Sequence, residues 1–267
     1  MPTIKVNRIN VYYEIVGQGE PLVLISGLGI EISGLVEHQN PDVVKKYRTV
    51  LIDNRGVGRT DKPNEPYTLE MMAEDVVGVM DALKIKRAHL LGISMGSRIA
   101  LTIAAKYPER VNGLVLWVAG TRLPPGLKLM TFMLTHIPGY SKTLNKTAKF
   151  IFDQKYPPTQ ESFLRQVAAN AQFDGRQMLP KIKAPTLIIN GTKDQLAPVK
   201  YGRELTEGIA GAQMILVEGG DHITIPTDPE LSVRPMLKFL AEVEARGVTM
   251  SAPADKKPTM AAKLPAK

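Results

Sequence analysis

Ser94 has the sequence surroundings that most clearly suggest chemistry. It lies in Gly92-Ile-Ser94-Met-Gly96, between the apolar run 88–91 and a segment whose apolar residues recur at helical spacing. This pattern predicts a strand, a sharp turn with the serine at its tip, and a helix. Where a helix packs that tightly on a strand, the positions two before and two after the serine have no room for side chains. We interpret Ser94 as an exposed nucleophile; the alternative is a serine that caps an ordinary helix.

A serine hydroxyl is a poor nucleophile near neutral pH, so it needs a base and a carboxylate that orients the base. Asp194 and His222 follow the apolar runs 187–190 and 215–217, which look like buried strands. The carboxyl ends of parallel strands meet at one edge of a sheet, so the three residues are expected to lie together there. Asp221 and Asp228 are alternative acids, although Asp221 adjoins His222 and would point elsewhere.

The other three histidines, His38, His89 and His136, are interpreted as structural or exposed. No pair of histidines has the spacing of metal ligands on a helix, and the chain has no cysteine. We therefore expect no metal site and no cofactor.

These motifs resemble the α/β-hydrolase fold, in which a nucleophile elbow is followed by an acid and then a histidine. The sequences Gly191-Thr-Lys-Asp194 and Gly219-Gly-Asp-His222 also resemble that family. The likeness extends over about residues 6–239 and is closest over 53–61 and 67–118. It points to the branch of esterases, enol-lactonases and carbon–carbon-bond hydrolases. Some relatives carry the acid one strand earlier, near Ala119, where this chain has none.

The resemblance also implies an oxyanion hole made by the backbone N–H groups of Met95 and Leu28. Relatives usually have His-Gly in the loop of Leu28, whereas this chain has Ser26-Gly-Leu-Gly29. Because the donor is a backbone N–H, it is present whichever side chain precedes it. The difference from relatives is therefore expected to affect the rigidity of the loop and to leave the donor in place. A serine at this position is reminiscent of 3-oxoadipate enol-lactonase.

Apolar runs that alternate with helical patterns predict an α/β fold with a mostly parallel, doubly covered sheet. Strands are expected near 4–16 (two strands), 22–25, 49–52, 88–91, 111–118, 184–189 and 213–217. Helices are expected at 34–46 with a break at Pro41, 69–83, 200–207 and 229–246.

Residues 1–119 and 181–246 are predicted to form the hydrolase core, and 120–180 a small helical lid inserted after the sixth strand. The lid segment is rich in large apolar residues, with breaks near 138–139 and 157–158. We expect the substrate pocket to be lined by Met130, Phe132, Met133, Leu134 and Phe152. Residues 247–267 have the composition of a disordered tail.

Composition narrows the class of protein. The chain of 267 residues has a net charge of +8, and four of those charges lie in 246–267. A nucleic-acid surface is therefore poorly supported. The chain has no apolar run near 18 residues and no signal-peptide pattern, which favours a cytoplasmic protein without a membrane span, either a monomer or a homodimer.

The sequence thus predicts a serine hydrolase that cleaves carboxylic esters of small to medium apolar substrates through an acyl-enzyme. An enol-lactonase or a carbon–carbon-bond hydrolase is the alternative within this class, and for a dicarboxylate-like lactone Arg55, Arg98 and Arg122 are candidate cations. A cofactor-free oxygenase or a ligand binder on the same scaffold is the alternative from another class.

Overall fold

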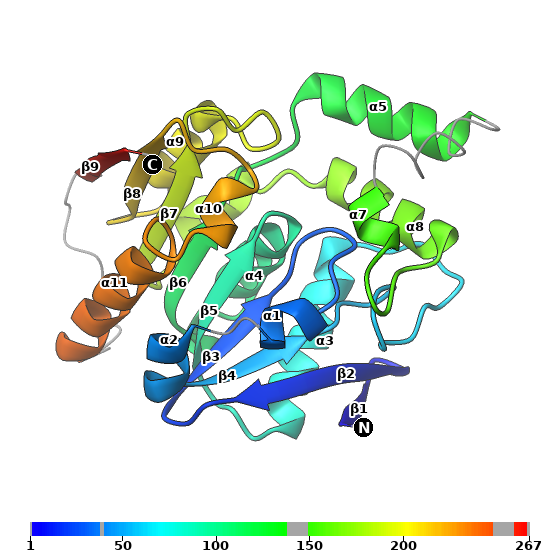
Figure 1. Cartoon of the computed structure of the whole chain (residues 1–267), viewed down its shortest axis with the longest axis horizontal. Coiled ribbons are helices and arrows are strands. Elements are labelled where there is room, and N and C mark those ends of the chain that lie inside the picture. Colours follow the sequence, from blue (N-terminus) through cyan, green and yellow to red (C-terminus); the bar gives the residue numbers. More distant parts are fainter. Residues whose placement is uncertain (1, 38–39, 138–148, 248–258, 266–267) are drawn as a thin grey trace.

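A single nine-stranded sheet forms the centre of the computed structural model, which describes residues 2–37, 40–137, 149–247 and 259–265 (Figure 1). The strand order is β1-β2-β4-β3-β5-β6-β7-β8-β9. The strands β1 to β9 are Thr3–Val6, Ile9–Val16, Glu20–Ile25, Tyr47–Ile52, Ala88–Ile93, Val111–Trp117, Thr186–Gly191, Gln213–Glu218 and Thr259–Pro265. β2 pairs antiparallel with β1 and β4, and all other neighbours are parallel.

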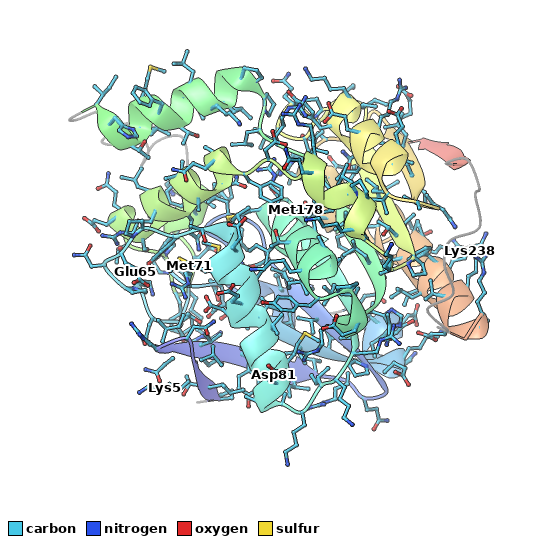
Figure 2. All side chains as sticks on the ribbon, turned by 180° about the vertical axis from the view of Figure 1, so that it is seen from behind. Lys5, Glu65, Met71, Asp81, Met178 and Lys238 are labelled. Atoms are coloured by element: carbon cyan, nitrogen blue, oxygen red, sulfur yellow. The ribbon has the colours of Figure 1, made fainter. Side chains whose placement is uncertain are left out.

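Helices cover both faces of this sheet. On one face lie α1 (Ser33–Glu37), α2 (Pro41–Lys46), α10 (Thr224–Thr227) and α11 (Val233–Ala245) (Figure 1). On the other lie α3 (Leu69–Ala82), α4 (Met95–Lys106) and α9 (Val199–Gly208). Figure 2 shows this second face, with Met71 and Asp81 marking α3 and Met178 marking the short helix η3 (Arg176–Lys181). The short helix η1 (Pro108–Arg110) leads into β6.

Alternate side chains of the strands supply two separate cores. In β3, Val23 and Ile25 belong to the core beneath α3 and α4, whereas Leu22 and Leu24 belong to the core beneath α2 and α11. A strand with both faces buried is apolar at nearly every position, which explains the nearly continuous apolar runs in the sequence. The predicted α/β-hydrolase fold and its parallel strands are confirmed.

The predicted helix at 34–46 is two helices, with Pro41 as the first residue of the second. The side chain of Asn40 caps α2 by accepting from the N–H of Asp42. Proline is favoured at this position because its missing N–H would have no partner in the first turn.

The described part of the segment between β6 and β7, for which the sequence predicts a lid, is largely helical. It contains α5 (Pro125–His136), α7 (Lys149–Phe152) and α8 (Gln160–Gln172), and α5 lies at the outside of the molecule (Figure 1). A small third core of Leu134, Ile151, Phe163 and Val167 holds these helices together. The break at 157–158 separates α7 from α8, whereas the break near 138–139 lies outside the described residues.

Residues 259–265 differ from the expected disordered tail, because they form β9. This strand pairs in parallel with β8, with Gln213 opposite Thr259 and Val217 opposite Leu264. Without β9, the edge of β8 would leave backbone N–H and C=O groups unpaired, and an extended segment can pair with them without an apolar or alternating sequence.

Among the described residues, none of the helices combines the length and apolar character needed to cross a membrane.

Candidate active site

Ser94 lies at a strained turn between β5 and α4. Its φ of 55° and ψ of −115° are unusual for a residue with a side chain. A Cβ atom at Gly92 would lie 2.5 Å from the carbonyl oxygen of Gly96, and one at Gly96 would lie 2.0 Å from that of Ile25. Only glycine fits at both positions. The backbone N–H of Ser94 donates to the carbonyl of Trp117 at 3.0 Å, which fixes the turn against β6.

The side chains of Ser94, His222 and Asp194 form one chain of hydrogen bonds. His222 Nε2 lies 2.8 Å from Ser94 Oγ, and His222 Nδ1 lies 2.8 Å from Asp194 Oδ2. The side chain of Asp194 is fully buried, whereas that of His222 is 16% exposed. This is the geometry in which a histidine can remove a proton from a serine while a carboxylate holds the imidazole in place.

The loops that carry the acid and the histidine are joined through their backbones. The N–H of Lys193 donates to the carbonyl of Gly220 at 2.9 Å. The second carboxylate oxygen of Asp194 accepts from the N–H groups of Leu196 and Ala197, both at 2.8 Å. These bonds orient the carboxylate so that its other oxygen faces His222.

The two alternative acids are engaged with their own loops. Asp221 Oδ1 accepts from the N–H groups of Ile223 and Thr224. Asp228 Oδ1 accepts from the N–H of Glu230. Of the acids considered from the sequence, the structure brings Asp194 to the histidine.

The other histidines lie outside this chain of hydrogen bonds. His89 is buried, packs edge-on against Tyr47, and lies 3.4 Å from the carboxylate of Glu244. His136 is exposed and stacks on Phe132. His38 is outside the described residues.

The loop that carries Leu28 packs against the start of α4, where Met95 follows Ser94. Met95 is the first residue of α4, where N–H groups lack a partner within the helix, and neither its N–H nor that of Leu28 donates to another group of the described residues. Ser26 Oγ donates to the carbonyl of Ile30 at 2.8 Å, and Asn54 Nδ2 donates to the carbonyl of Ser26 at 3.1 Å. Ser26 thus ties the loop to itself.

The five residues expected to line the pocket fall into two groups. Leu134 is buried in the third core, and Phe152 packs against that core together with Leu28. Met130 and Phe132 are 44% and 55% exposed, on the outer side of α5, and Met133 is half-buried on the same helix. The sequence did not fix which side of α5 faces inward, and Leu134 is on the inner side.

The three arginines considered as candidate cations have different partners. Arg55 is bonded to Asp75 and Glu65, and Arg122 to Glu204. Arg98 has only neutral acceptors among the described residues, namely the carbonyl of Gly120 and the backbone and side chain of Asn170. Burial lowers the pKa of Arg98 to about 10.

Two lid residues that the sequence did not single out also reach the loop of Leu28. Gln166 Oε1 accepts from the N–H of Gly29 at 2.9 Å, and Gln154 Nε2 donates to the carbonyl of Gly29 at 2.7 Å. Gln166 lies on the same side of α8 as the buried residues Phe163 and Val167. A polar residue on the apolar side of a helix was a signal that could have identified it.

The comparisons with known proteins agree on one family. Residues 20–155 match the model described as alpha/beta hydrolase fold, and residues 160–247 match one described as TAP-like protein. The chain is 31% identical to the 2-hydroxy-6-oxo-6-phenylhexa-2,4-dienoate hydrolase of Comamonas testosteroni, over 76% of this chain and 82% of the relative. It is 26% identical to the putative carbamate hydrolase RutD of Azorhizobium caulinodans, over 91% of this chain and all of the relative.

Among solved structures, the enol-lactonase of Burkholderia xenovorans LB400 superposes with a TM-score of 0.79 at 28% identity. The match covers 90% of this chain and all of that chain.

Proposed function

The chain belongs to the α/β-hydrolase family, and from this membership we propose that it is a serine hydrolase that cleaves carboxylic esters through an acyl-enzyme. The observation that carries the proposal is the unbroken series of hydrogen bonds from Ser94 through His222 to Asp194. The strained backbone of Ser94 also supports the proposal. Such strain persists only where the surrounding structure imposes it, and strained residues cluster at active sites.

In the proposed reaction, His222 removes the proton of Ser94 as the hydroxyl attacks the ester carbonyl. The N–H groups of Leu28 and Met95 stabilise the oxyanion that forms. His222, now cationic and oriented by Asp194, protonates the departing alkoxide. Water then attacks the acyl-enzyme while His222 accepts its proton, and His222 returns that proton to Ser94 Oγ as the bond between Ser94 and the acyl group breaks and the acid is released.

The apolar lid supports substrates of small to medium size with an apolar acyl or alcohol group. We propose that Met130, Phe132, Met133, Leu134 and Phe152 line the pocket. Leu134 and Phe152 have the stronger support, since they belong to or contact the same apolar cluster as Leu28.

A lactone that carries a carboxylate is a second candidate substrate. Arg98 favours it, because a buried guanidinium without a carboxylate partner among the described residues is costly until an anion binds. Arg98 is one helical turn along α4 from Ser94, so it lies near the reacting group. The likeness to a solved enol-lactonase is in agreement with this candidate.

A fluorophosphonate probe tests the proposal at its first step. The wild-type chain is expected to be labelled at Ser94, and the Ser94→Ala variant is expected not to react. A ligand binder would not be labelled at all.

A panel of p-nitrophenyl esters and lactones then separates the substrate classes. Faster turnover of the esters supports the main proposal, and faster turnover of a carboxylated lactone, lost in Arg98→Met, supports the second candidate. A chain that reacts with neither the probe nor any substrate of the panel contradicts both.

A further inference from the structure

Both polar backbone groups of Gly29 are bonded to side chains of the lid. Its N–H donates to Gln166 Oε1 at 2.9 Å, and its carbonyl accepts from Gln154 Nε2 at 2.7 Å. Gln154 Oε1 also accepts from the N–H of Glu31 at 3.0 Å. Three backbone groups of the loop 26–32 are thus fixed by two glutamines that lie more than 120 positions further along the chain.

The glutamines are themselves fixed. Gln166 is fully buried, and its Nε2 donates to the carbonyl of Arg55 at 2.8 Å. Gln154 Nε2 also donates to the carbonyl of Ile151 at 2.7 Å. In each glutamine both the amide oxygen and the amide nitrogen are bonded, so a flipped amide would lose these bonds, and each side chain holds one orientation between the lid and the core.

The close contact at this position requires a glycine. Its φ is +69°, and a Cβ atom there would lie 2.8 Å from Ile151 Cγ2 and 2.9 Å from the ring of Phe163. The lid therefore covers the loop at van der Waals distance, and the side chain of the preceding residue, Leu28, packs against the same lid cluster.

We infer that Gln154 and Gln166 are positioning residues for the oxyanion hole: the closed lid holds Gly29, and through it the N–H of Leu28, in the orientation that receives the oxyanion. This inference rests on the proposed function for its catalytic consequence. The rigidity of the loop 26–32 then comes in part from these two side chains.

Two substitutions of similar size test these side chains, Gln166→Leu and Gln154→Leu. The matched control is Ser162→Ala, which removes another bond between the lid and the core, from Ser162 Oγ to the carbonyl of Gly56 at 2.6 Å, without touching the loop. Gln154 is only half-buried, so its variant is expected to fold even where that of the fully buried Gln166 does not.

The first measurement is amide hydrogen exchange by NMR, which does not depend on catalytic activity. The N–H of Ile30 donates to the carbonyl of Gly27 within the loop, so its exchange reports the loop itself and not the deleted bond. Exchange at Ile30 is expected to be at least about tenfold faster in both glutamine variants and unchanged in Ser162→Ala. Unchanged exchange at Ile30 in a folded Gln154→Leu variant would overturn the inference.

The second readout is the hydrolysis of p-nitrophenyl acetate. Misplacing one oxyanion donor lowers kcat by about 10- to 1000-fold and leaves ground-state binding intact, so kcat is expected to fall while KM changes less than about threefold. An equal loss of kcat in Ser162→Ala would show a general effect of lid stability and contradict the positioning role. If the wild type hydrolyses no substrate of the panel, the proposed function fails, whereas the exchange measurement still decides whether the lid holds the loop.

Discussion

His222 Nε2 lies 2.8 Å from Ser94 Oγ, although 128 positions separate the two residues in the chain. Each arrives there through its own strand, Ser94 at the end of β5 and His222 beyond the end of β8. Because parallel strands present their carboxyl ends at one edge, the sheet brings together residues that no local interaction could join.

The Ser94→Ala variant is expected to keep the fold and to lose ester hydrolysis. Ser94 is half-buried and its hydroxyl makes no contact with the core, so the melting temperature should change by less than a few degrees. The matched control is Ser97→Ala. This change removes the hydrogen bond from the Ser97 hydroxyl to the carbonyl of Ser94 and leaves the Ser94 hydroxyl in place. Steady-state kinetics with p-nitrophenyl acetate decide the matter: more than a few per cent of wild-type turnover in Ser94→Ala would exclude it as the nucleophile.

Asp194→Asn is expected to lower kcat by about 10⁴-fold with little change in KM. The oxygen that accepts from Leu196 and Ala197 would remain in place, so the new amide NH₂ would face His222 and stabilise the wrong tautomer. Asp221→Asn provides the control, because Asp221 adjoins the histidine but is bonded to its own loop. Comparable losses in the two variants would contradict the assignment of the acid.

The sequence predicts these three residues because each leaves a local signal. Ser94 is flanked by glycines that the turn requires, and Asp194 and His222 follow short apolar runs of the kind typical of buried strands. Gln166 leaves a weaker signal, since its helix is predictable but its partner, Gly29, is 137 positions away. A contact of that kind depends on how the lid docks, which periodicity does not encode. The same limit applies to α5, whose inner side is fixed by Leu134 in the third core.

A chain truncated after Arg246 is expected to keep its activity, because Ser94, Asp194 and His222 all precede the cut. Truncation removes β9, which adds one edge strand to β8, so the melting temperature should fall by no more than a few degrees. Differential scanning calorimetry and p-nitrophenyl acetate turnover, compared with the full chain, measure the two effects. A large loss of either would show that residues 247–267 contribute more to the domain than edge pairing.

The stability of the fold is expected to fall as the pH drops below about 6.5, the usual pKa of histidine. Burial of His89 lowers its pKa; the carboxylate of Glu244 opposes that shift and Arg87 adds to it. The folded state therefore binds its proton less readily than the unfolded state. The stabilising contribution is complete above about pH 6.5 and is lost as the pH falls toward the folded pKa, with a slope of at most about 1.4 kcal/mol per pH unit.

Urea unfolding at pH 7.5, 6.5 and 5.5 measures that slope. Replacing His89 with glutamine removes the titrating group, so the slope between pH 6.5 and 5.5 should flatten even if the variant is less stable overall. His136→Gln is the control, because that histidine is exposed on α5. A slope in the His89 variant equal to that of the wild type would assign the pH dependence to other groups.

The lid is expected to set the preferred acyl chain length. The side chain of Leu28, whose N–H is a proposed oxyanion donor, packs against the cluster of Leu134, and Phe152 packs against the same cluster. We therefore expect the acyl chain to run past these side chains. Each methylene buried there contributes about 0.8 kcal/mol, so kcat/KM should rise about fourfold per methylene until the pocket is full. Phe152→Ala and Met133→Ala are expected to move that limit to longer p-nitrophenyl esters, with acetate turnover nearly unchanged.

The exposed position of Phe132 makes its variant the informative comparison. If Phe132→Ala shifts the limit as Phe152→Ala does, the outer side of α5 turns toward the substrate when the lid closes on it. If it does not, the inner cluster alone shapes the pocket. An unaltered chain-length preference in every single alanine variant of Met130, Phe132, Met133, Leu134 and Phe152 would show that none of these five side chains shapes the pocket, and it would contradict the proposed pocket lining.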